Sequence, residues 1–124
     1  MSNISRGACS GREDLKDLAK MRERFQRDGK AVRLGNLASE LRRLGGWIQS
    51  GRDDDVIIEL MRKIAWLMEW MQDGATREIA DMQREICRWR RIWPLDQARS
   101  LLAFRARNMS YQLLAQSGLL SAEK

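Results

Sequence analysis

Hydrophobic residues recur with a helical period along most of the chain, and residues 75–93 show this pattern most clearly. At about 100° of rotation per residue, the apolar side chains of this stretch fall within about 80° of one another. They are Ile79, Met82, Ile86, Trp89 and Trp93. The arginines on the opposite side are Arg77, Arg84, Arg88 and Arg91. The pattern predicts a helix with one face in a core and a cationic face turned away from it.

Similar periodicity predicts four further helices, over residues 12–28, 36–50, 54–73 and 94–117. Ser10 and Glu13 form a capping box before the first of them, and Asn36 is suited to cap the second. Pro94 is suited to the first turn of the last helix. That helix is expected to bury Leu101, Leu102, Met109 and Leu113.

The segments between the predicted helices are short, and neither a strand pattern nor an internal repeat is present. A chain of 124 residues is long enough for one core and short for two. We therefore expect an all-α fold, a single helical bundle of about five helices. The bundle is expected over residues 12–118, with a flexible leader over 1–11 and a frayed tail over 119–124.

Three local features bear on packing and partners. The glycine pair Gly45–Gly46 indicates either a kink in the second helix or a close approach by another backbone. Trp66 and Trp70 lie beside Lys63 on the less apolar side of the third helix, where they would stack bases or anchor a partner subunit unless the last helix covers them. The acids of residues 53–55 suit the start of a helix better than a cation site, because consecutive residues do not converge on one point.

The residue types of the chain exclude several kinds of chemistry. There is no histidine, which removes histidine-dependent acid–base catalysis and histidine-containing metal sites. Cys9 and Cys87 lie outside any C-x-x-C pattern, so they are expected to be reduced structural thiols. No phosphate-binding glycine loop, nucleophile elbow or paired-carboxylate motif is present. We therefore expect no enzyme activity, no metal and no cofactor.

The distribution of apolar residues predicts a protein without a membrane partner. No apolar run approaches the roughly 18 residues that a membrane span needs. The first residues of the chain lack the hydrophobic region of a signal peptide. A cytoplasmic location is the resulting expectation.

The formal net charge is +6, and arginine is far more frequent than lysine. Arginine binds phosphate oxygens bidentately and stacks on bases, although a GC-rich genome also favours arginine over lysine. Arg84, Arg88 and Arg91 cover about 10 Å along a helix that rises about 1.5 Å per residue, which matches a few successive phosphates of one strand. The predicted partner is the backbone of RNA or single-stranded DNA, and a merely solvated arginine face is the competing interpretation.

Two segments carry a resemblance to a known family. Residues 59–66 read Glu-Leu-Met-Arg-Lys-Ile-Ala-Trp, and residues 36–44 read Asn-Leu-Ala-Ser-Glu-Leu-Arg-Arg-Leu. In a short, basic, histidine-free helical bundle, these segments resemble the small subunit of class 1 CRISPR–Cas effector complexes, especially the type III form. The chain departs from that family at residues 67–70, where the small subunits often carry Gly-Arg, so a type IV or type I counterpart stays open.

The resemblance implies a non-catalytic subunit that is present in several copies beside other effector subunits. Such a subunit would hold a guide–target duplex or a displaced strand by its backbone. The positions that match the family's basic residues are Arg42, Arg43, Arg62 and Lys63. The alternative is a protein-only adaptor that docks its partners through Trp66 and Trp70, with the arginines solvated.

Overall fold

The computed structural model describes residues 11–71, 76–94 and 96–118, and their side chains from residue 17 onward except at position 96. This part of the chain consists of five α-helices and one short 3₁₀ helix, and it contains no strand. In chain order they are α2 (Gly11–Arg27), α3 (Lys30–Ser50), α4 (Asp54–Glu69), α5 (Arg77–Ile92), η2 (Asp96–Ala98) and α6 (Arg99–Ser117). The prediction of an all-α bundle of about five helices is confirmed. The predicted leader, apart from its last residue, and the predicted tail lie outside the described residues.

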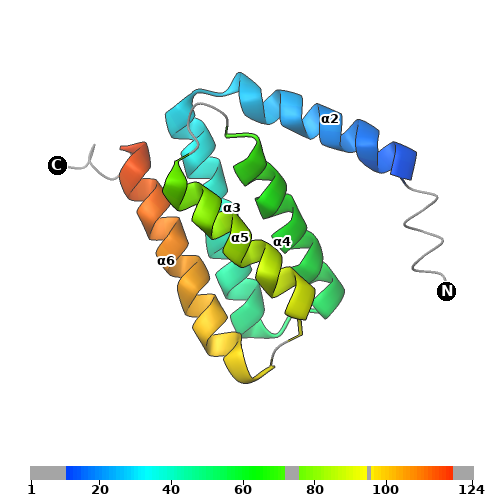
Figure 1. The fold of residues 1–124 in the computed structure, drawn as a ribbon, viewed down its shortest axis with the longest axis vertical. Helices are drawn as coiled ribbons and strands as arrows, with labels where there is room; N and C mark the ends of the chain where they lie inside the picture. The colour runs from blue at the N-terminus through cyan, green and yellow to red at the C-terminus, as the bar shows by residue number, and fades with distance from the viewer. Residues whose placement is uncertain (1–10, 72–75, 95, 119–124) are drawn as a thin grey trace.

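Helices α3 to α6 form an up-and-down four-helix bundle, and α2 lies across one end of it (Figure 1). Helix α3 packs most extensively on α6, and α4 packs on both α3 and α5. The C-terminal part of α2 is fixed by the buried side chain of Phe25, while its N-terminal half extends past the other helices (Figure 1). Within the described residues, no helix has the length and apolar character needed to cross a membrane.

Each helix of the bundle buries an apolar face that recurs every three or four residues. The buried residues of the first two bundle helices include Leu37, Leu41, Leu44, Ile48, Ile57, Met61, Ile64 and Met68. Those of the last two include Ile79, Met82, Ile86, Trp89, Leu102, Met109 and Leu113. Burial of one such side chain stabilises the fold by about 1.5–3 kcal/mol, so these faces determine the rotation of every helix. Leu101 is an exception to the predicted core, since 60% of its surface is exposed.

Helices α3 and α6 lie in close contact at Gly45. A Cβ atom at this position would lie 3.1 Å from the carbonyl oxygen of Ala103 and 3.2 Å from Cγ of Arg107. At the adjacent Gly46 a Cβ atom would meet nothing within 4 Å. The close approach that the glycine pair indicated is therefore confirmed, and it depends on Gly45 alone.

The second predicted helix begins earlier than expected. We expected Asn36 to cap it after a loop, whereas α3 begins at Lys30. Arg33, in the first turn of α3, is buried and donates a hydrogen bond from Nη1 to the carbonyl oxygen of Met71 at 3.2 Å. The earlier start places Gly35 inside the helix, at a cost of about 1 kcal/mol relative to alanine. The hydrogen bond of Arg33 and the burial of Leu34 offset this cost.

Two other predicted helix boundaries are wrong. Helix α4 ends at Glu69 instead of Asp73, because the two residues that follow Glu69 turn back into the core. Pro94 does not begin the last helix, because α6 starts at Arg99 after the short helix η2. The residues between α5 and α6 are needed to reverse the direction of the chain.

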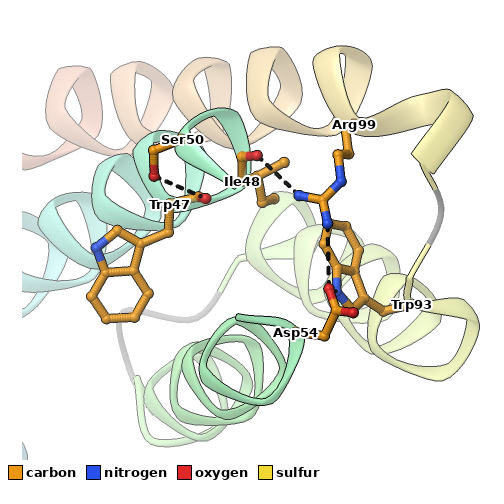
Figure 2. A network of polar contacts seen from close by, with 6 residues as sticks. All are labelled: Trp47, Ile48, Ser50, Asp54, Trp93 and Arg99. Atoms are coloured by element: carbon orange, nitrogen blue, oxygen red, sulfur yellow. Dashed lines mark hydrogen bonds and ion pairs between the residues drawn. The ribbon is translucent and has the colours of Figure 1, made fainter. Parts of the chain in front are cut away.

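A polar network joins the bundle helices at the end where α6 begins (Figure 2). Trp93 donates from Nε1 to Oδ1 of Asp54 at 2.9 Å. Arg99 lies 3.3 Å from the same carboxylate oxygen and donates to the carbonyl oxygen of Ile48 at 3.2 Å. Its guanidinium also lies over the Trp93 ring, 4.8 Å from the ring centroid. Asp54 is thus the acid that joins α4 to α6, while Asp53 lies at the N-cap of α4 without a capping hydrogen bond from its side chain and Asp55 lies in the first turn.

We expect the two adjacent glycines to respond in opposite ways to one substitution. Gly45→Leu forces a side chain against the backbone of α6, so the free energy of unfolding should fall by about 1–3 kcal/mol. Gly46→Leu replaces glycine at an open helical position, so the free energy of unfolding should rise by about 0.5–1 kcal/mol. Urea unfolding followed by circular dichroism measures both changes. A Gly45→Leu variant as stable as Gly46→Leu would contradict the close approach.

Candidate nucleic-acid interface

Helix α5 presents the arginine face that its periodicity predicts. Its apolar residues are buried, and the four arginines on the opposite side are exposed. We call these residues the α5 arginine stripe; they are Arg77, Arg84, Arg88 and Arg91. The stripe spans about 21 Å at a rise of about 1.5 Å per residue. Its exposed position on one helix face is confirmed, and its partner stays a prediction.

Contacts at its start and along both flanks hold α5 in this rotation. Thr76 caps its N-terminus by accepting a hydrogen bond from a backbone N–H of the first turn at 3.2 Å. Arg105 of α6 donates two hydrogen bonds to the carboxylate of Glu85, at 2.8 and 3.0 Å. Gln83 donates to the carbonyl oxygen of Ala65 on α4 at 3.1 Å. The stripe is therefore carried by a helix that is fixed from α4 and from α6.

The charge of the stripe is only partly neutralised. Asp81 is the acid that lies among the stripe residues, and it pairs with Arg84. Glu85 is engaged by Arg105, and these hydrogen bonds raise the pKa of the Arg105 guanidinium above its usual value. The stripe residues without an ion pair or hydrogen bond to any described residue are Arg77, Arg88 and Arg91. These three guanidinium groups keep their donors available for a ligand.

A shallow hollow of about 310 Å³ lies along the stripe. It is lined by Gln83, Arg84, Cys87, Arg88 and Arg91. Gln83 and Cys87 were not among the predicted site residues, although their spacing of four residues places them beside Arg91 on the helix surface. The guanidinium groups around the hollow can donate hydrogen bonds to an anionic group, whereas the amide nitrogen of Gln83 already donates to Ala65 and to Glu69.

The other predicted basic residues lie on α3 and α4; they are Arg42, Arg43, Arg62 and Lys63. Glu40 lies 3.2 Å from Arg43 and 2.7 Å from Lys63. Glu59 lies 3.4 Å from Arg62, while Arg42 is exposed without such a partner among the described residues. Three of these four cations thus form ion pairs, with two carboxylates shared among them. No ion pair or hydrogen bond within the described residues links this group to the α5 arginine stripe.

Trp66 and Trp70 of α4 differ in exposure. Trp70 has only 5% of its surface exposed, whereas Trp66 has 36% exposed. Their rings stack with centroids 5.6 Å apart. The prediction that Trp70 contacts a partner is therefore wrong for this structure, because the turn that ends α4 folds Trp70 into the core. Trp66 keeps an accessible surface, and stacking on the Trp70 ring holds its side chain in place.

Neither metal-site geometry nor comparison with known proteins assigns a function. Among the residues that the structure describes, no cluster of three or more Cys, Asp or Glu side chains could hold a metal ion. A scan against protein-family models, a search of curated proteins and a search of solved structures each give no match. The resemblance to CRISPR small subunits stays a prediction.

Repulsion within the stripe should lower the stability of the fold. Arg88 has Arg84 four residues before it and Arg91 three residues after it, and each like-charged pair destabilises a helix by about 0.2–0.5 kcal/mol. Glu85, three residues before Arg88, offsets one of these two pairs, so Arg88→Gln should raise the free energy of unfolding by about 0.2–0.5 kcal/mol at low salt, and the gain should vanish near 1 M salt. Arg22→Gln is the matched control, because Arg22 is exposed on α2 without a charged residue at those spacings. A destabilised Arg88→Gln variant would contradict the repulsion.

Proposed function

We propose that this protein binds the phosphate backbone of RNA or single-stranded DNA through the α5 arginine stripe. The observation that supports the proposal is a row of exposed guanidinium groups on one helix face, with Asp81 as the acid among them. Arginine makes charge-assisted, bidentate hydrogen bonds to phosphate oxygens. Such contacts also release counterions from the strand, and this release is the main source of affinity in sequence-independent binding.

The setting of α5 favours contact with the backbone over reading of bases. The exposed residues of α5 are mainly arginines and include no asparagine or glutamine, the residues that bind adenine bidentately in a major groove. Contacts to phosphates position a strand without distinguishing its sequence. The proposed binding is therefore independent of sequence.

We further propose that the protein is a non-catalytic, cytoplasmic subunit of a multi-subunit ribonucleoprotein. In this role it would hold a guide RNA with its target, or a displaced strand, beside neighbouring effector subunits. The support is the resemblance to the small subunit of class 1 CRISPR–Cas effector complexes, together with the absence of histidine from the chain. One arginine row binds a strand weakly by itself, and linkage to other strand-binding subunits would raise its effective affinity.

A protein-only adaptor is the second candidate, and the exposed Trp66 supports it. Tryptophan is enriched at protein interfaces because it contributes a large contact area. An adaptor should be purified free of nucleic acid and should keep its protein partners after nuclease treatment. RNA that copurifies with the protein, together with partners that are lost when this RNA is digested, would favour the first proposal instead.

Replacing three stripe residues together tests the first proposal. The triple variant Arg84→Gln, Arg88→Gln, Arg91→Gln should bind oligouridine and an unrelated mixed sequence at least about tenfold more weakly at about 0.1 M salt. The wild-type plot of log affinity against log salt should have a slope near −2, from about −0.7 for each of three phosphates. The slope of the triple variant should fall in magnitude to about −0.7, because Arg77 is the one stripe residue that it keeps. Fluorescence anisotropy of labelled strands measures both quantities.

Helix α2 offers a matched control for this experiment. Lys20, Arg24 and Arg27 are exposed at the same spacing, so their replacement by Gln changes the net charge by the same amount. This control variant should keep most of its affinity for both strands, because under the proposal the cations of α2 contribute to the overall charge of the protein but do not contact the strand. Equal losses in the two triple variants, or unchanged binding by the α5 variant, would remove the stripe from the site.

A single acid-to-amide change should strengthen binding. Asp81→Asn releases Arg84 from its ion pair and removes a negative charge that a phosphate would face. We expect affinity for oligouridine to rise by about two- to fivefold, since an exposed pair contributes about 0.2–1 kcal/mol. Asp17→Asn on α2 makes the same change in net charge at an exposed position away from the stripe. The same gain in both variants would show an effect of net charge alone.

A further inference from the structure

Helix α6 is apolar on two opposite sides. Its inner side is buried in the bundle, as described above, but three large apolar residues on its outer side are exposed. They are Leu101 (60% exposed), Phe104 (57%) and Tyr111 (65%). We call these three residues the α6 ridge; they lie within about 80° of one another around the helix axis. No charged side chain of α6 falls within that arc, and Asn108 is the one polar residue of α6 inside it, so the ridge is uncharged and mainly apolar.

A concave apolar surface lies on another part of the molecule. A groove of about 510 Å³ runs between α2, α3 and α4. Its apolar lining, which we call the apolar groove, consists of Leu18, Met21, Trp47, Val56, Leu60 and Trp66. The volume lies within the range of about 300–1,000 Å³ that is usual for binding sites, and a groove of this kind suits the apolar side of a helix.

The ridge and the groove match in length and in charge. The three ridge residues extend over about 15 Å of α6, and the groove follows α4 from Asp55 to Trp66, over about 16 Å. The charged residues that line the groove are three cations and two acids, so the lining carries a net charge of only +1; they are Arg43, Arg62, Lys63, Asp55 and Glu59. Glu40, which is not part of the lining, pairs with both Arg43 and Lys63. Two copies that each carry a net charge of +6 could therefore meet here with little local repulsion.

The two surfaces also lie on opposite sides of the bundle. Figure 1 shows α6 at the left edge and α4 at the right, with α3 and α5 between them. A single molecule therefore cannot bring its own ridge to its own groove. This placement explains how both apolar surfaces can stay exposed in an isolated chain.

We propose that a second copy of this chain docks its α6 ridge in the apolar groove of the first. The two partners use different surfaces, so each docked copy leaves one ridge and one groove free, and the contact is repeated from copy to copy. The interaction needs no nucleic acid. A row of copies would repeat the α5 arginine stripe along one strand, and only this last consequence rests on the proposed function.

Sedimentation equilibrium of the nuclease-treated full chain tests the proposal. The contact as proposed uses three ridge residues and six groove residues, fewer than the roughly 20–30 a side of a typical stable interface, so we expect weak association. The mass should start near 14.4 kDa and rise by at least about twofold as concentration increases into the high micromolar range. Phe104→Glu places a charge on the ridge, and Trp66→Glu places one in the groove. Each variant alone should stay monomeric. Gln49→Glu, which adds the same charge on an exposed part of α3, should assemble like the wild type.

Mixing the two variants gives the decisive measurement. The ridge variant keeps an intact groove and the groove variant keeps an intact ridge, so a mixture should form a one-to-one dimer and nothing larger. Circular dichroism and thermal unfolding must first show that both variants are folded. If Trp66→Glu does not fold, Met21→Glu on the α2 side of the groove replaces it.

Three results would overturn the proposal. The first is a wild-type protein that stays monomeric at every concentration. The second is a mixture of folded variants that stays monomeric. The third is self-association that Phe104→Glu abolishes and the groove variant keeps, because this pattern means that ridge packs on ridge. None of these results depends on strand binding, so the proposal can fail while the role of the α5 arginine stripe stands.

Discussion

Burial of the apolar side of α5 determines how the molecule presents its charge. Large side chains such as Ile86 and Trp89 leave water only if α5 turns that side toward the rest of the bundle, and each one stabilises the fold by about 1.5–3 kcal/mol. The opposite side of the same helix must then face outward, and it carries the arginines. The pair between Glu85 and Arg105 holds the same rotation from the flank. The core therefore sets the position of the α5 arginine stripe, at the cost of repulsion within it.

The acidic residues determine which cations remain available. Glu40 of α3 pairs with Arg43 on its own helix and with Lys63 of α4, so it joins the two helices. Asp54 does the same between the ends of α4 and α6, where it holds Arg99 and accepts a bond from Trp93. Acids used in this way leave the outer face of α5 with little compensation. The outer side of α5 therefore carries an excess of positive charge, with Asp81 as the acid among four arginines.

Periodicity predicted the helices and most of their buried faces, because a repeat of 3.6 residues reports which side of a helix is apolar. Periodicity could not show which side chains are buried by contacts with other helices and turns. The start of α3 was misplaced because Arg33 is buried against the end of α4, a contact between residues 38 positions apart. The periodicity placed Trp70 on an outer face of a longer helix. In the structure α4 ends before Trp70, and the turn that follows carries its side chain into the core. Adjacent leucines at 101 and 102 both fit a core pattern, and only the packing of α6 shows that Leu102 is buried while Leu101 is exposed.

The two proposed contacts use separate parts of the surface, and this separation has an energetic consequence. Copies with a net charge of +6 repel one another in solution, so a small apolar contact between ridge and groove is opposed by long-range electrostatics. A bound polyanion removes that repulsion without covering either apolar surface, since its phosphates would lie on α5. Docking of a second copy would in turn hold another arginine stripe beside the same strand and raise its effective concentration there. Each contact should therefore strengthen the other, by an equal coupling free energy in both directions.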